Sequence, residues 1–189
     1  MGTRDRIIHA ARHAFAELGY SATTNKLLAD GAGVTTGAIY HYFDSKVDLY
    51  RAVNNDVQSL VYSQFEAAVD ASDNFVGGLE RVLELANQLN NEDPTLARFL
   101  GAVRIDVRRN PELKSLFKPA TIRRERFIHA LVDIGIATGE LDVTDRERTV
   151  ALLRALLVGL VDAVSNDPTM HRAAVDGIKL LVEGKLIRS

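Results

Sequence analysis

The chain has 189 residues, of which 47% are hydrophobic and 25% are charged, the composition of a folded globular protein with one or two domains. The absence of cysteine excludes disulfides, thiolate catalysis and cysteine-based zinc sites. No apolar run approaches the roughly 20 residues that span a bilayer, and the N-terminal segment carries scattered charges, so we expect a cytoplasmic protein without a membrane partner.

The net charge of −2 is unusual for a protein that binds nucleic acid, so the placement of the charges matters more than their sum. The first 50 residues contain five lysines and arginines and five acidic residues, which excludes a basic stripe along this segment. Thr24 and Ser45 stand where helices can begin. Binding of phosphate groups would therefore depend on these helix N-termini, because free backbone N–H groups there attract anions.

Apolar residues recur with a helical period from Thr3, whose hydroxyl can cap a helix, to Gly19, which can end it. This pattern predicts a scaffold helix. His9 and His13 are four residues apart on it, but the glutamate of a zincin motif is missing between them. We therefore interpret them as exposed histidines and predict no metal site.

The stretch from residue 27 to 50 has the pattern of two short helices joined by a tight turn, followed by the start of a third helix. Gly33 stands where a chain leaving a helix needs a positive φ, and Thr35 or the next residue can cap the second helix. That helix would turn Ile39 and Phe43 inward and leave small, hydroxyl and aromatic residues on its free face. A short helix held in this way fits a DNA major groove, so we interpret the stretch as a helix-turn-helix.

Several elements of the first quarter of the chain keep a specific mutual spacing: an aromatic after a helix-end glycine, a threonine cap, an Ala-Gly-Val corner, and an aromatic-rich helix followed by a turn and a lysine. In order, these elements are Gly19 and Tyr20, Thr23 and Thr24, Ala32 with Gly33 and Val34, Gly37 to Phe43, and Ser45 with Lys46. In this pattern the segment from Thr3 to about Val53 resembles the N-terminal domain of the TetR-type transcriptional repressors. Two positions depart from it: Gly31 costs roughly 1 kcal/mol relative to alanine inside a helix, and Thr36 replaces the lysine or other long polar residue of many members.

The resemblance implies an all-α protein with an N-terminal three-helix, helix-turn-helix DNA-binding domain over residues 1–50. A helix starting at residue 46 would link it to a C-terminal helical ligand-binding and dimerisation domain over residues 51–189. The residues implied for DNA binding are Thr24, Thr35, Thr36, Gly37, Tyr40, His41, Tyr42 and Lys46, with Thr24 and Lys46 on phosphates. For Tyr40, a packing role and a DNA contact remain equally open.

The rest of the chain also reads as helices. A long helix is predicted from Lys46 to about Ala71, and the following ones are expected over residues 75–89, 96–108, 119–139, 149–164 and 168–185. The run Arg123, Arg124, Glu125, Arg126 is interpreted as a solvated helix face, because Glu125 and the neighbouring apolar positions interrupt any basic patch.

Large aromatics and leucines alternate with isolated polar groups along several of these helices, a mixture typical of ligand pockets. This pattern, together with the family resemblance, predicts an apolar cavity for an unknown small-molecule effector. The residues predicted to line it are Tyr62, Phe65, Leu83, Asn87, Phe99, Val103, Phe127 and Leu131. An ordinary solid core with polar groups at its rim is the alternative for any single residue.

The segment from Thr149 to Val164 is apolar around nearly its whole circumference, and a helix of this kind must be buried on nearly all sides. With the next helix it predicts a homodimer interface, against the alternative of a buried central helix in a monomer. The predicted interface residues are Leu153, Leu157, Val161, Val164, Ala174, Ile178 and Leu181.

An enzyme would need groups that converge on one site, and the sequence offers none. The glycines from Gly31 to Gly37 do not have dinucleotide or P-loop spacing, and His129 and His171 lack a paired nucleophile or carboxylate cluster. We therefore expect no catalytic site and no cofactor. The predicted function is a dimeric, ligand-responsive repressor that binds a palindromic double-stranded DNA operator. The alternative is a helical protein-interaction module whose helix-turn-helix does not bind DNA.

Overall fold

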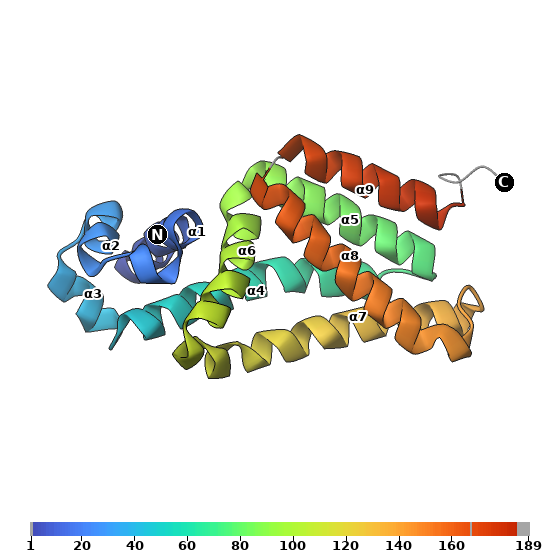
Figure 1. Cartoon of the computed structure of the whole chain (residues 1–189), viewed down its shortest axis with the longest axis horizontal. Helices are drawn as coiled ribbons and strands as arrows, with labels where there is room; N and C mark the ends of the chain where they lie inside the picture. Colours follow the sequence, from blue (N-terminus) through green and yellow to red (C-terminus); the bar gives the residue numbers. More distant parts are fainter. Residues whose placement is uncertain (1, 167, 185–189) are drawn as a thin grey trace. The chain divides into compact units, whose positions relative to one another are not determined.

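A computed structural model describes residues 2–166 and 168–184. Of residues 115–117, 120, 162–166 and 168 it describes the backbone and not the side chains. All regular structure in these ranges is helical, with nine α-helices and two short 3-10 helices (Figure 1). None of the described helices is long and apolar enough to cross a membrane. The predicted all-α class is confirmed.

The chain folds into two compact units. Unit 1 comprises Met1–Ser59 and Thr95–Ala120. It contains α1 (Thr3–Ala22), α2 (Asn25–Ala32), α3 (Thr36–Tyr42), the first part of α4 (Lys46–Asp70), nearly all of α6 (Pro94–Arg109) and the 3-10 helix η1 (Pro111–Phe117).

Unit 2 comprises Leu60–Pro94 and Thr121–Ser189. It contains the end of α4, α5 (Phe75–Glu92), most of α7 (Lys118–Thr138), the 3-10 helix η2 (Val143–Asp145), α8 (Arg146–Asn166) and α9 (Pro168–Val182). Helix α9 packs along both α5 and α8 (Figure 1). The first boundary between the units falls inside α4, and residues 95–120 belong to unit 1. The division into a DNA-binding domain over residues 1–50 and a ligand-binding domain over residues 51–189 stays a prediction.

The turns of unit 1 follow from local side-chain chemistry. The hydroxyl of Thr24 accepts from the Leu27 N–H at 3.3 Å and caps α2, and Thr35 caps α3 by accepting from the Ala38 N–H at 3.1 Å. Gly33 adopts φ 62° and ends α2 in the left-handed region, as predicted.

The prediction for the first helix was wrong at its start, because Gly2, and not Thr3, occupies the N-cap position of α1. Gly19 has the expected positive φ of 73° and is not helical, so the first helical segment ends there as predicted. A second segment follows this kink and continues α1 to Ala22.

Ion pairs connect the helices of unit 2. Arg123 on α7 donates from Nε to Glu66 on α4 at 2.8 Å and lowers the pKa of that carboxyl below its usual value. Glu125, also on α7, pairs with Arg154 on α8. The arginine run interpreted as a solvated face is therefore partly engaged in intramolecular pairs.

Two glycines of the helix-turn-helix provide a matched test of this backbone geometry. We expect Gly33→Ala to lower the free energy of unfolding by about 1–2 kcal/mol, because an L-residue is strained at φ 62° even though its Cβ would meet nothing within 4 Å. Gly31→Ala should raise it by up to about 1 kcal/mol, because Gly31 lies inside α2 and its Cβ would make an ordinary contact, 3.6 Å from the Ala10 Cβ. Chemical denaturation measures the free energy of unfolding of both variants. Equal changes of the same sign would contradict the backbone geometry assigned to the two glycines.

Candidate nucleic-acid interface

Helix α3 is held against the rest of unit 1 by one apolar face. Ile39 and Phe43 are only 2% and 5% exposed, and Val34 at the preceding turn is half-buried. Phe43 donates its backbone N–H to the Ile39 carbonyl and closes the helix at its C-terminus. Burial of this face fixes which side of the short helix turns to solvent.

The residues that the sequence predicted for DNA binding lie on α3 and its Thr35 cap, at the N-cap of α2 and at the start of α4. All of these side chains except that of Lys46 are exposed, and they are Thr24, Thr35, Thr36, Gly37, Tyr40, His41 and Tyr42. Tyr40 is 48% exposed, and its hydroxyl accepts a hydrogen bond from the Asn25 side chain on α2. Its ring is thus outside the core, and its orientation is set by α2.

Lys46 is placed differently from the other predicted residues. Its ammonium donates to the carbonyls of Tyr20 and Thr23 at 2.9 Å each, and it lies 4.4 Å from the centre of the Tyr20 ring. Burial lowers its pKa, while the nearby carboxylate of Asp106 acts in the opposite direction. Lys46 therefore has a structural role at the end of α1 that the sequence pattern did not reveal, and its predicted phosphate contact stays a prediction.

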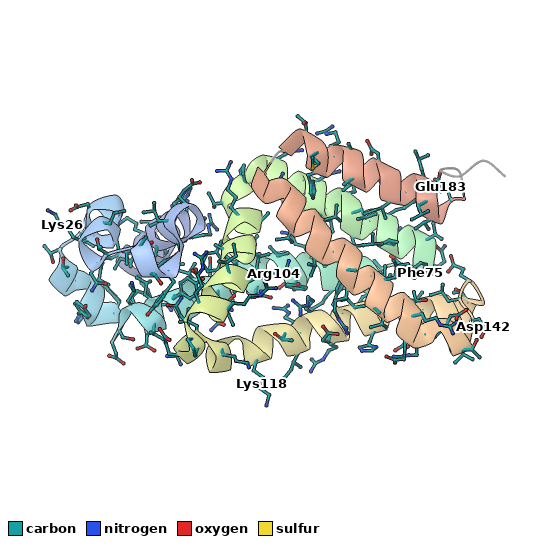
Figure 2. The ribbon with its side chains drawn as sticks, in the orientation of Figure 1. Lys26, Phe75, Arg104, Lys118, Asp142 and Glu183 are labelled. Carbon is teal, nitrogen blue, oxygen red and sulfur yellow. The ribbon has the colours of Figure 1, made fainter. Side chains whose placement is uncertain are left out.

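Unit 1 also carries cations that the sequence did not assign to DNA binding. Lys26 is an exposed cation on α2 (Figure 2), one turn from the α2 N-cap. Arg4 lies over the Phe43 ring at 5.4 Å and, with Arg51, lines an open polar groove of about 450 Å³ that Asp44 also borders. This groove is polar, so it does not have the apolar lining expected of the effector cavity.

The residues predicted to bind an effector fall into both units. In unit 2, Tyr62, Phe65 and Phe127 form an aromatic cluster with ring centres 5.7–6.0 Å apart. Burial raises the pKa of the Tyr62 hydroxyl. Leu83 and Leu131 are buried and Asn87 is half-buried in the same unit, whereas Phe99 and Val103 belong to unit 1.

The residues predicted at a dimer interface differ in exposure. Leu153 and Ile178 are 3% and 8% exposed and are thus packed within the chain, whereas Leu157, Val161 and Ala174 are half-buried and Leu181 is 42% exposed. The side chain of Val164 lies outside the described residues. Several small and apolar residues of α8 and α9 are exposed, namely Leu152, Ala155, Gly159, Met170, Ala173, Leu180 and Leu181.

Comparison with known proteins gives a consistent result. Residues 7–53 match the family described as "Bacterial regulatory proteins, tetR family". The HTH-type transcriptional regulator UidR of Escherichia coli (strain K12) is 22% identical over 189 residues, which cover 99% of this chain and 94% of that protein.

Two solved structures share the fold. A TetR transcription regulator from Haloarcula marismortui has a TM-score of 0.79 at 20% identity, covering 96% of this chain and 97% of that one. The transcriptional regulator FadR from Bacillus subtilis, in complex with stearoyl-CoA, has a TM-score of 0.72 at 23% identity, covering 95% of this chain and 98% of that one.

The position of Lys46 predicts a stability effect that an exposed lysine would not have. Lys46→Met should lower the free energy of unfolding by about 2 kcal/mol, because two buried carbonyls lose a charged donor. Lys26→Met, the same change at an exposed site on α2, should stay within about 0.5 kcal/mol of the wild type. Indistinguishable urea midpoints for the two variants would contradict the structural role.

Proposed function

We propose that this chain, a member of the TetR family of bacterial transcriptional regulators, is a dimeric repressor that a small, largely apolar effector releases from a palindromic operator. The observation that carries the proposal is the geometry of α3. This helix is capped by Thr35, buried along Ile39 and Phe43, and exposed along the hydroxyl and aromatic residues that face away from the core.

In this proposal α3 enters the major groove of double-stranded DNA. Gly37 permits close approach of the backbone, and Thr36, Tyr40 and His41 are presented toward base edges and phosphates. The N-terminus of α2 at Thr24 offers backbone N–H groups to a phosphate, so binding does not require a strongly basic surface. Lys26 adds a positive charge beside that terminus.

A second copy of the chain would supply the second recognition helix. The face on α8 and α9 formed by Leu152, Ala155, Gly159, Leu180 and Leu181 is exposed in the single chain, and Gly159 has open space around it. Small residues let two helices approach closely, and a two-fold axis brings the same surface of both copies together. A symmetric dimer of this kind reads a palindrome.

The proposed effector site lies in unit 2. The cluster of Tyr62, Phe65 and Phe127 provides aromatic surface for an apolar molecule, and Arg123 and Glu66 add polar groups beside it. The similarity in fold to FadR, whose structure is in complex with stearoyl-CoA, supports an effector with a long apolar part, because the acyl chain of that ligand is apolar. A preference of roughly 3 kcal/mol for the non-binding conformation would weaken operator affinity about a hundredfold.

The recognition role of α3 is tested by selecting bound duplexes from a random DNA pool. We expect a palindromic sequence, and we expect Tyr40→Ala to weaken its binding about tenfold or more without lowering the melting temperature, because the Tyr40 ring is exposed. Leu60→Ala, a truncation of an exposed residue on α4, should leave the affinity unchanged. If no sequence is enriched, or if affinity is nearly independent of salt, the chain is a protein-interaction module and the DNA-binding proposal fails.

The oligomeric state tests the role of α8 and α9. Leu181→Glu should convert a dimer into monomers at micromolar concentration, because it would place an unpaired charge in a desolvated contact at a cost of several kcal/mol. Ile122→Glu introduces the same charge at an exposed apolar position on α7 and should leave the dimer intact. Light scattering measures both, and a wild-type chain that is monomeric under these conditions would overturn the interface.

A further inference from the structure

The corner between α1 and α2, formed by residues 19–24 and called here the α1–α2 corner, connects the scaffold helix to the helix-turn-helix. Its central residue is Tyr20, whose backbone N–H and carbonyl both bind charged side chains. The Tyr20 N–H donates to Asp106 Oδ2 at 2.9 Å, and the Tyr20 carbonyl accepts from Lys46. Thr23 is fully buried and donates its hydroxyl to the Gly19 carbonyl at 2.7 Å.

Asp106 lies on α6, far along the chain from the helix-turn-helix, yet both belong to unit 1. It is 6% exposed, and its Oδ2 also accepts from the Tyr50 hydroxyl at 2.7 Å. Burial, together with the hydrogen bond to Asp106, raises the pKa of Tyr50 well above its ordinary value, so this hydroxyl remains a donor. The carboxylate thus joins α6 to α1 and α4 through one oxygen atom.

The backbone at the corner is shaped to admit this carboxylate. Gly19 has a φ of 73°, and a Cβ at that position would lie only 3.1 Å from Asp106 Oδ1. Two further contacts join the same parts of the chain: Arg98 on α6 pairs with Glu17 on α1, and Asn110, which directly follows α6, accepts from the Ser21 hydroxyl at 3.1 Å. Those two contacts are exposed, whereas the contact of Asp106 is buried.

We propose that Asp106 is a positioning residue for DNA recognition: by holding the Tyr20 peptide and the Tyr50 hydroxyl it sets the α1–α2 corner, and thereby the angle at which α3 is presented. This inference rests on the proposed function and extends it, because it makes operator affinity depend on α6, outside residues 1–50. Removing the carboxylate takes its hydrogen bond from the buried Tyr20 N–H and from the Tyr50 hydroxyl, so the corner must rearrange to compensate.

The test separates positioning from charge. Asp106→Ala and Asp106→Asn both remove one negative charge, which by electrostatics alone would raise affinity for DNA. Positioning predicts the opposite for Asp106→Ala: about tenfold weaker binding of the selected operator, with affinity for a random duplex changed less than about twofold. Asp106→Asn keeps an acceptor oxygen where Oδ2 lies and should restore most of the operator affinity.

Tyr50→Phe supplies a milder variant, because it removes one donor and keeps the ring that packs against Phe15 at 4.7 Å and Tyr20 at 5.1 Å. It should lower operator affinity severalfold, again without changing binding to the random duplex. If Asp106→Ala does not fold, Asp106→Asn and Tyr50→Phe decide the question. Asp56→Asn, at an exposed site on α4, controls for the loss of charge alone.

The outcomes distinguish the two proposals. A wild-type chain that enriches no DNA sequence refutes the proposed function itself. A wild-type chain that binds its operator refutes the role of Asp106 if Asp106→Ala and Tyr50→Phe bind the operator equally well, or if they lose operator and random duplex by the same factor, because an equal loss reports only a smaller folded fraction.

Discussion

The buried carboxylate of Asp106 is the contact on which the recognition geometry depends. It accepts from a backbone amide at the end of α1 and from a tyrosine hydroxyl on α4, while Lys46 donates to the carbonyls of Tyr20 and Thr23. A negative and a positive group thus hold the two successive peptide groups that flank the Tyr20 Cα. Hydrogen bonds to charged groups are about twice as strong as neutral ones, and burial protects them from screening by salt.

Helix α3, whose angle the corner sets in our proposal, is itself only seven residues long. An isolated helix of that length is unstable in water, since the cost of nucleating its first turn is not recovered over so few hydrogen bonds. Its position therefore comes from Thr35 at its start and from the burial of Ile39 and Phe43. The same burial leaves one face free, and this free face, within the residues that match the tetR family model, is the surface that we propose binds DNA.

Local signals predicted the helix-turn-helix well. Thr24, Thr35 and Gly33 have the cap and turn roles that their chemistry and spacing indicated, because each depends on atoms within a few residues. Asp106 and Tyr20 are separated by 86 positions, so no pattern in the sequence could pair them. Lys46 illustrates the same limit, since its carbonyl acceptors lie more than 20 residues upstream. On α8, apolar residues around nearly the whole helix left open which ones pack inside the chain.

Hydrogen exchange at the Tyr20 amide tests the central claim most directly. This N–H lies at a kink, where an unsupported amide would exchange quickly, but its bond to the buried Asp106 carboxylate predicts slow exchange that requires opening of unit 1 as a whole. The predicted rate is that of core amides in α4, such as Val53. Exchange as fast as that of an exposed turn amide would show that the carboxylate does not hold the corner, and would contradict the account.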